Sequence, residues 1–408
     1  MKIISAVIFA FIIALFSGCN TVKSEKEIIV NTGTWLGELH LNDSTVLPFI
    51  YNVDFNDGRI VTIMNGSEKV VLETELENPD SLILNFPVYQ TRLCIQNGEE
   101  VWLGYFEKLD SKEEYRIPFV GSFGFNDRLP NNEPACCALP ERWKATFTEG
   151  EKQSNAIGEF KLEGNNLSGS FLTEYGDYRF LEGKLNGNQL NLYGFDGGYI
   201  QVFKGHLQND SLYGQYFSGL TGYKTWFATP DETFELSDPD NISELNPEFD
   251  SICFSYPGID GKSVDYAPTA NYGKVTILQI TGSWCPNCKD QGRYLQQLKN
   301  EFKDQGLQVL GIAFERMGTL EASIEAAKKS KEDLGTDYRV GIAKYNRDQV
   351  AEEEFPFLTK IKSYPTLIFI DKKGSVRKIH TGFSGPGTTK YNELTNGLTQ
   401  FTKDLLNE

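Results

Sequence analysis

Hydrophobic and polar residues alternate in short runs through the first half of the chain, downstream of an apolar N-terminal stretch. The runs 35–41, 59–63 and 81–84 are examples, and turn-forming residues separate such runs. A period of two with frequent turns is typical of antiparallel strands. The pattern therefore predicts an all-β region over residues 33–227. Two meanders that divide near residues 121–141 would form a sandwich or barrels.

A weak internal repeat supports this interpretation. Two leucines bracket four turn-forming or polar residues at 162–167, 185–190 and 207–212. Asn, Gly and Asp supply the positive φ angles that tight turns need, so each copy predicts a hairpin turn. The many aromatic residues of this region are expected to fill the sheet faces, and a ligand groove lined by them is the alternative.

The pattern changes beyond residue 254, where apolar runs alternate with helical spacing. Residues 277–280 read as a buried strand, and a helix is predicted from Cys285 to about residue 305. Between the two regions, residues 228–254 are rich in Pro, Asp, Glu, Asn and Ser, which suits a linker. The sequence therefore predicts a multidomain protein in which an antiparallel all-β region precedes an α/β domain over residues 255–408.

Charge separates the same two regions. The 408 residues carry a formal net charge of −17, with 39 basic and 56 acidic residues. Of these, 18 basic and 37 acidic residues lie before residue 255, and 21 and 19 follow it. An acidic chain with a pI near 4.8 is unsuited to binding nucleic acid.

The N-terminus reads as a targeting segment. Lys2 precedes an uncharged apolar run over residues 3–16, which has the length of a signal-peptide core and is short for a membrane span. The run ends in Leu-Phe-Ser-Gly-Cys at residues 15–19, which resembles the lipobox of bacterial lipoproteins. The resemblance implies a signal peptide over residues 1–18, a lipid on Cys19 and a tether over residues 19–32. An ordinary cleaved signal, with Cys19 a passive thiol, is the alternative.

Six cysteines remain when Cys19 is set aside, an even number that suits an oxidising, exported compartment. Cys136 and Cys137 lie in a proline-bounded loop that a bridge to Cys94 would pin, and Cys253 is expected to be buried or bridged. The three histidines are scattered, so no metal site is expected. No cofactor is expected either, since no His follows Cys288 as haem attachment would need.

The strongest chemical signal is Trp-Cys-Pro-Asn-Cys at residues 284–288, placed between the predicted strand and helix. The first thiol would face the unpaired N–H groups and positive dipole end of that helix, which stabilise a thiolate. Cys285 is thus the predicted nucleophile. Cys288, one turn further on, is placed to attack the resulting mixed disulfide. A static structural bridge is the alternative.

These residues resemble the thioredoxin superfamily and, within it, the TlpA/ResA-like thiol-disulfide oxidoreductases. The resemblance starts near residue 256 and excludes the β region. It implies that Pro365 is a cis-proline and that Trp284, Tyr364, Pro365 and Thr366 form the surface that binds an extended substrate. The elements expected after the cysteine pair support it, namely strands at 307–314, 338–342 and 363–371, helices at 320–334, 348–360 and 391–406, and a hairpin turn at 372–374.

Two positions depart from the family's pattern. Gln279 and Gln291 stand where members often carry carboxylates that move the proton of the second thiol. Because an amide does not titrate, this role would fall to Asp290, to Glu315 or to water, and resolution of the mixed disulfide would be slower. Solvated surface charge is the alternative for both carboxylates.

The resemblance implies a membrane-anchored, extracytoplasmic enzyme that reduces disulfides of exported proteins and takes electrons from a membrane-bound donor. Asn20 after Cys19 suggests the outer membrane over the inner, with the protein facing the periplasm. One alternative is a binding lipoprotein whose β region engages an envelope ligand or partner. A peroxiredoxin-like peroxidase, with an antioxidant activity, is another, although the Pro-x-x-x-Thr-x-x-Cys signature is missing around Cys285.

Overall fold

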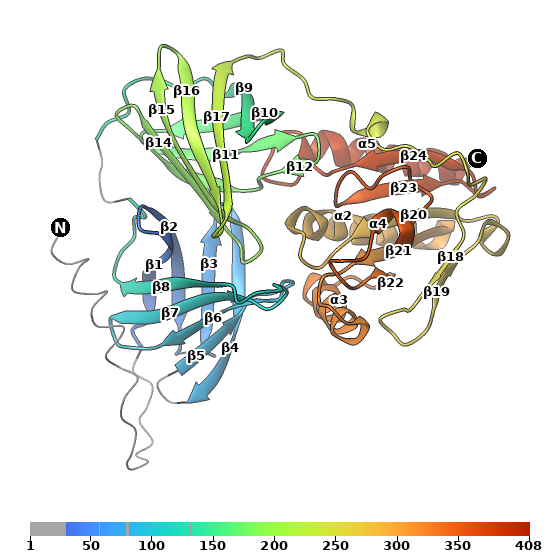
Figure 1. The fold of residues 1–408 in the computed structure, drawn as a ribbon, viewed down its shortest axis with the longest axis horizontal. Coiled ribbons are helices and arrows are strands. Elements are labelled where there is room, and N and C mark those ends of the chain that lie inside the picture. The colour runs from blue at the N-terminus through green and yellow to red at the C-terminus, as the bar shows by residue number, and fades with distance from the viewer. Residues whose placement is uncertain (1–29, 57, 79–80, 130–132) are drawn as a thin grey trace.

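The structure is a computed structural model that describes residues 30–56, 58–78, 81–129 and 133–408 (Figure 1). It has an all-β part, which we call the β half, and an α/β domain that begins at β18 and ends with α5. The predicted fold class is confirmed. The predicted signal peptide and Cys19 lie outside the described residues. Within the described ranges, no helix combines the length and the apolar character needed to cross a membrane.

The first part of the β half is a closed antiparallel barrel, because β1 pairs with both β2 and β8. Trp35, Tyr51 and Trp102 stack within it, each at most 2% exposed. These rings fill its interior. Its strands are β1 (Gly33–Asn42), β2 (Thr45–Asp54), β3 (Ile60–Asn65), β4 (Glu68–Asn78), β5 (Ser81–Asn85), β6 (Thr91–Gln96), β7 (Val101–Lys108) and β8 (Arg116–Phe123).

The second part is a nine-stranded sheet whose additional β10–β11 pairing joins its ends into a ring. All three repeats, at 162–167, 185–190 and 207–212, are hairpin turns, as the sequence predicts. The strands are β9 (Arg142–Glu149), β10 (Lys152–Glu163), β11 (Asn166–Thr173), β12 (Gly176–Asp177), β13 (Leu181–Asn186), β14 (Gln189–Phe195), β15 (Ile200–Gln208), β16 (Ser211–Ser218) and β17 (Gly222–Pro230).

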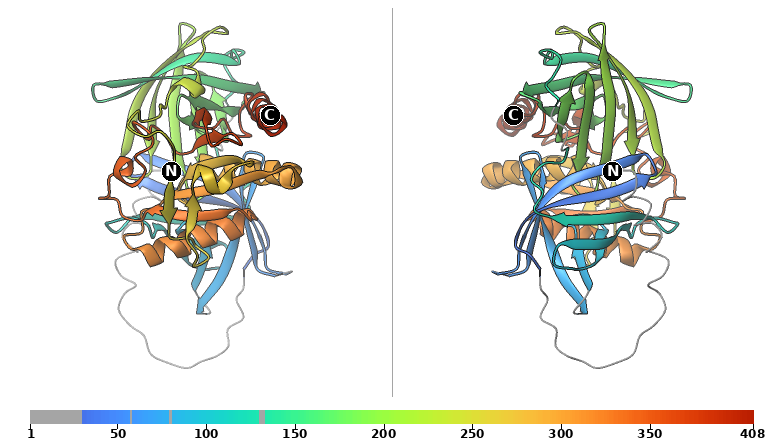
Figure 2. Two further views of the ribbon diagram at one scale, coloured as in Figure 1. Left: turned by 90° about the vertical axis from the view of Figure 1, so that its right-hand side faces the viewer. Right: turned by 90° about the vertical axis from the view of Figure 1, so that its left-hand side faces the viewer.

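One hydrophobic cluster spans both parts of the β half, and the second part also has a core of its own. Phe195 of β14 contacts Phe49, Phe86 and Phe106 of the first barrel, with ring centroids 4.7–5.7 Å apart across this group. Two opposite views, each at right angles to Figure 1, show the second sheet stacked on the first barrel (Figure 2). Because separating the parts would expose these rings to water, the β half behaves as one body.

The α/β domain is built on a five-stranded sheet in the order β22-β21-β20-β23-β24, parallel in its first three strands. Its helices α2, α3 and α5 pack on one face of the sheet. Its elements are β18 (Phe254–Tyr256), β19 (Val264–Tyr266), η2 (Pro268–Asn271), β20 (Val275–Thr281), α2 (Pro286–Phe302), η3 (Lys303–Gln305), β21 (Leu307–Phe314), α3 (Leu320–Leu334), β22 (Arg339–Lys344), α4 (Ala351–Glu354), β23 (Thr366–Ile370), β24 (Val376–Thr381) and α5 (Tyr391–Asn407).

Strand β20 explains why this domain has two apolar clusters. Val275 and Ile277 face the helices, whereas Leu278 and Ile280 join a second cluster on the opposite face. A strand covered on both faces reads as a continuous apolar run, which is the pattern seen in the sequence. Neither cluster includes a buried residue of the β half.

Two expectations about these segments need correction. The helix predicted over residues 348–360 is only α4, Ala351–Glu354. Pro356 lacks the N–H that a longer helix would need, and Phe355, Phe357 and Leu358 pack into the second apolar cluster instead. The linker segment also docks on the α/β domain: it forms the 3₁₀ helix η1 (Pro239–Asn241), and a carboxylate oxygen of Asp240 lies 2.7 Å from Nδ1 of His380.

The sequence left the pairing of the other cysteines open, and the possible bridge from Cys94 to the loop with Cys136 and Cys137 is absent among the described residues. In the described part of the chain the disulfide is Cys285–Cys288, and Cys94, Cys136, Cys137 and Cys253 are free thiols. Cys94 lies on β6, where its sulfur approaches Glu107. Cys253, expected to be buried or bridged, is exposed.

Candidate active site

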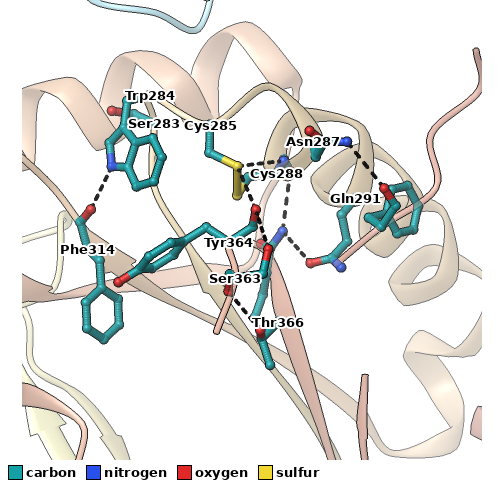
Figure 3. The surroundings of a disulfide bond; sticks show 12 residues. Ser283, Trp284, Cys285, Asn287, Cys288, Gln291, Phe314, Ser363, Tyr364 and Thr366 are labelled. Atoms are coloured by element: carbon teal, nitrogen blue, oxygen red, sulfur yellow. Dashed lines mark hydrogen bonds between the residues drawn. A yellow bond between two sulfur atoms is a disulfide. The ribbon is translucent and has the colours of Figure 1, made fainter. Parts of the chain in front are cut away.

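The cysteine pair lies at the junction between β20 and α2 (Figure 3). Cys285 is the N-cap of α2, and its sulfur accepts a hydrogen bond from the Cys288 amide at 3.2 Å. Pro286 occupies the first turn, where a missing N–H costs nothing. The first sulfur therefore takes the position of a capping oxygen, and an unpaired helix N–H is satisfied by it. This geometry stabilises a thiolate on Cys285 when the pair is reduced.

The loop before β23 faces the first sulfur. Sγ of Cys285 lies 3.3 Å from the carbonyl oxygen of Tyr364, and the Tyr364–Pro365 peptide bond is cis, as the resemblance implies. Trp284 packs against the Tyr364 ring at 5.2 Å between centroids and donates from Nε1 to the Phe314 carbonyl. Thr366 Oγ1 donates back to the carbonyl of Ser363. Of the four residues predicted as a binding surface, Trp284, Tyr364 and Thr366 thus lie around Cys285 (Figure 3), and Pro365 joins Tyr364 to Thr366.

The two glutamines singled out in the sequence contact each other behind Cys288. Gln279 donates from Nε2 to Oε1 of Gln291 at 3.1 Å, and it accepts at Oε1 from the Tyr338 hydroxyl at 2.9 Å. Both amides are at most 1% exposed. The side of the pair where relatives often carry carboxylates is therefore an amide network without a titratable acid.

Glu315 is the carboxylate that the structure brings to the cysteine pair. It follows β21 and lines a cavity of about 40 Å³ together with Cys285 and Cys288. Its oxygens accept hydrogen bonds from the backbone N–H and the hydroxyl of Ser283, at 2.9 and 2.7 Å. Burial raises the pKa of Glu315 to about 7, against the lowering effect of these bonds. A carboxyl with this pKa exchanges a proton near neutral pH.

Asp290, the other predicted proton carrier, is engaged elsewhere. Its two oxygens accept from Nε and Nη2 of Arg179 at 2.8 and 3.0 Å. Arg179 follows β12 in the β half, and its side chain is 2% exposed. Both carboxylate oxygens of Asp290 are thus occupied by Arg179, and Glu315 remains the candidate proton carrier.

The β half contributes a cluster of buried charges that the sequence did not reveal. Arg179 and Lys289 are the buried cations, and both bind Glu68 and Asp196. Burial alone would raise the pKa of Glu68, but the charges of Arg179 and Lys289 lower it to about 2. We call Glu68, Arg179, Asp196, Lys289 and Asp290 the joint cluster. Sequence offered only one signal for it, the adjacent charges Lys289 and Asp290 on the buried side of a helix.

Comparison with known proteins agrees with this geometry. The AhpC/TSA family matches residues 250–379. These residues lie in the C-terminal part of the chain, which is a thioredoxin-like domain. Two relatives are named thiol-disulfide oxidoreductase ResA. The one from Geobacillus kaustophilus is 30% identical over 27% of this chain and 56% of its own length. That from Geobacillus thermodenitrificans is 26% identical over 35% of this chain and 70% of its own length.

The chain thus spans little more than half the length of the first of these relatives. Among solved structures, a thiol:disulfide interchange protein of the thioredoxin family from Chlorobium tepidum is 20% identical, with a TM-score of 0.29. The similarity covers 40% of this chain and 97% of that one.

Proposed function

We propose that the thioredoxin-like domain is a thiol-disulfide oxidoreductase that reduces disulfides of exported proteins through Cys285 and Cys288. The observation that carries this proposal is the position of the first sulfur, which caps α2 and accepts the Cys288 amide at 3.2 Å. A bridge that only stabilised the fold would have no need of such thiolate stabilisation.

The proposed reaction has two exchange steps. The Cys285 thiolate attacks one sulfur of the substrate disulfide, whose S–S bond breaks, and the leaving sulfur takes up a proton. The Cys288 thiolate then attacks the sulfur of Cys285 and releases the second substrate thiol. In total the substrate gains two electrons and two protons, and the enzyme ends with the Cys285–Cys288 disulfide.

Glu315 would serve the second step as a positioned base. Cys288 must lose its proton before it attacks, and the Glu315 carboxyl lines the same cavity as both cysteines. The cavity of about 40 Å³ has room for a water molecule that relays the proton between the two groups. A pKa of about 7 leaves roughly half of the Glu315 carboxyls ionised at neutral pH.

The substrate would lie along the loop before β23. Trp284, Tyr364, Pro365 and Thr366 surround Cys285 and supply an aromatic surface and backbone polar groups. An extended segment that carries a disulfide pairs with such a backbone edge as an added strand would.

The predicted N-terminal features suggest where this enzyme works. A signal peptide over residues 1–18 and a lipid on Cys19 would anchor the chain in the cell envelope, facing the periplasm and preferably at the outer membrane. Electrons would then come from a membrane-bound donor. The supporting observation is the apolar run that ends in Leu-Phe-Ser-Gly-Cys.

The deciding experiment measures the reduction potential of the pair together with turnover of a protein disulfide. Wild-type protein is equilibrated in thiol buffers, and Cys285→Ser is the inactive comparison. A potential near that of thioredoxin, about −270 mV, with turnover that Cys285→Ser abolishes supports a reductase. A value near −120 mV would make the protein an oxidant.

Cys253→Ser, which removes an exposed free thiol, is the matched control and should leave turnover unchanged. A pair that does not exchange in any buffer would refute the proposal.

A further inference from the structure

The β half covers the cysteine pair. Cys285 and Cys288 are each only 3% exposed, although an attacking sulfur must come within bonding distance of its target. The cavity of about 40 Å³ beside them has room for water but not for a polypeptide segment. In the arrangement seen here, a protein disulfide cannot reach Cys285.

Two glycines of the β half pack closely against α2. A Cβ atom on Gly198 would lie 2.6 Å from the Tyr89 ring and 2.9 Å from Cγ of Pro286, the residue between the two cysteines and next to Cys285. A Cβ on Gly176 would lie 3.1 Å from Nδ2 of Asn287. At both positions the absence of a side chain permits the approach.

Hydrogen bonds hold the same surfaces together. The Tyr199 hydroxyl donates to Oδ1 of Asn287 at 2.7 Å. Ser363, beside the proposed substrate loop, donates from Oγ to the carbonyl oxygen of Tyr175 at 2.7 Å. The backbone at Tyr175 therefore lies where a substrate segment would approach this loop.

The contact between the two bodies is largely polar, although Leu334 of α3 packs against the hydrophobic cluster of the first barrel. The joint cluster supplies buried charged contacts, including Arg179–Asp290 at 2.8 Å and Lys289–Glu68 at 3.1 Å, and Lys112–Asp348 and Arg347–Asp110 add more exposed ones. The hydrophobic cores are separate: two lie in the β half and two in the thioredoxin-like domain. Polar interfaces between domains permit relative motion, because water replaces the lost contacts without exposure of a core.

We propose that the β half is a movable cover that determines which disulfides reach Cys285, and that the joint cluster and the Tyr199–Asn287 contact hold it closed. An extended, disulfide-bearing polypeptide segment then takes the place that Tyr175 and Gly198 hold in the closed form. This inference rests on the proposed function and assigns the β half a specificity role within it.

The test measures how fast Cys285 reacts with a bulky maleimide in the reduced full chain, with peptide mass spectrometry to resolve each thiol. Cys253, which is exposed, is the internal standard. In wild type we expect Cys285 to react far more slowly than Cys253. The Cβ that Gly198→Ala adds should push the β half away from α2, and Tyr199→Phe removes one hydrogen bond between them. Each variant should therefore speed labelling of Cys285 by about tenfold.

Gly397→Ala is the matched control, because a Cβ at this helix position meets no atom within 4 Å. The proposal that the β half covers Cys285 would be overturned if wild-type Cys285 were labelled as fast as Cys253, or if neither variant accelerated its labelling. The assay is independent of turnover. If Cys285 is labelled slowly and the protein reduces no disulfide, only the proposed function is rejected. If Cys285 is labelled fast and turnover is normal, only the proposal that the β half covers Cys285 is rejected.

A second pair of thiols lies on an independent part of the β half. The sulfur atoms of Cys136 and Cys137 are 3.2 Å apart, and both residues are exposed. Their loop is fixed to a hairpin turn, since Cys136 donates its N–H to the Gly187 carbonyl at 2.9 Å and Gly187 donates to the Pro134 carbonyl at 3.1 Å. The hydrogen bond to Cys136 raises the pKa of the Cys137 thiol.

We infer that Cys136 and Cys137 form a reversible vicinal disulfide when a small disulfide such as oxidised glutathione is the oxidant. One thiolate attacks the small disulfide and releases one glutathione thiol. The neighbouring thiolate then displaces the second, so that two protein thiols are oxidised as one disulfide is reduced to two thiols. Adjacent Cα atoms are about 3.8 Å apart, below the usual disulfide range, so the bond is strained and readily reduced.

Mass spectrometry after incubation of the reduced full chain with oxidised glutathione tests this inference. The peptide with Cys136 and Cys137 should lose two hydrogens and retain no glutathione. Cys253 is the matched control, because it has no neighbouring thiol among the described residues and should keep the adduct. Cys136→Ser should convert Cys137 to a stable adduct. A lasting adduct on either cysteine of the wild-type pair would overturn the inference.

Discussion

The thioredoxin-like domain and the β half use their buried polar residues differently. In the thioredoxin-like domain the residues proposed for chemistry lie close together in sequence or at the ends of neighbouring strands, as Cys285, Cys288 and Glu315 do. The β half contributes no residue to this group, yet Arg179 and Asp196 reach the helix that carries Cys285 and Cys288. A motif therefore locates the reacting atoms, whereas control of access to them lies in a region without a motif.

Loss of either cysteine should have the largest effect and would separate the two regions most clearly. Cys285→Ser should abolish turnover. Cys288→Ser should stop the reaction at the mixed disulfide, because no second thiolate displaces the substrate. Non-reducing electrophoresis and mass spectrometry would detect this adduct. If Cys285→Ser and Cys288→Ser trapped the substrate equally well, the assignment of the nucleophile would be wrong.

Removal of Arg179, the central cation of the joint cluster, should have the second largest effect. Arg179→Met would remove the buried cation that pairs with Asp290 and would leave Asp196 only Lys289 as a cationic partner, and breaking a buried pair typically costs about 3–5 kcal/mol. Chemical denaturation of the oxidised protein measures this loss in the free energy of unfolding. Lys328→Met removes an exposed pair with Glu325 and should change it by less than about 1 kcal/mol. Equal losses in the two variants would contradict the importance of the cluster.

Glu315 links stability and activity to pH. Its pKa of about 7 in the folded chain lies above the unfolded value near 4.5, so its stabilising contribution is complete below pH 4.5 and is lost as pH rises through 7. The difference amounts to about 3 kcal/mol.

In the oxidised protein, Glu315→Gln should therefore flatten the fall in the free energy of unfolding between pH 5 and 8. The same variant should slow resolution of the mixed disulfide above pH 7, where the native carboxylate is ionised. An unchanged pH profile in both measurements would exclude a role for Glu315.

The smallest effect is expected at the amide network. Gln291 is fully buried, and its Nε2 atom has no hydrogen-bond partner among the described residues. Gln291→Glu would place a titratable carboxylate beside Cys288 and should speed turnover of a model disulfide by several fold at a pH where it ionises. Turnover no faster than that of the parent at every pH would refute the idea that the amide slows the reaction.

Local sequence predicted much of the thioredoxin-like domain. The strand at 307–314 and the helix at 320–334 match β21 and α3 in both ends. Apolar spacing and end signals coincide there: Thr319 caps α3 at its start, and Gly335 ends it in the left-handed conformation. The helix predicted over 348–360 was too long, because Phe355 and Leu358 are apolar for packing and not for a helix face.

The sequence alone determined the antiparallel all-β region, the α/β domain and the identity of the cysteine pair, because hydrophobic period, turn residues and a strand-Cys-helix motif are local signals. Only the tertiary structure decided that Asp290 binds Arg179 while Glu315 lines the cavity of the pair. It also decided that the β half covers Cys285. Arg179 and Asp290 lie 111 positions apart in the chain, and the charge of a single side chain does not indicate which distant partner will neutralise it.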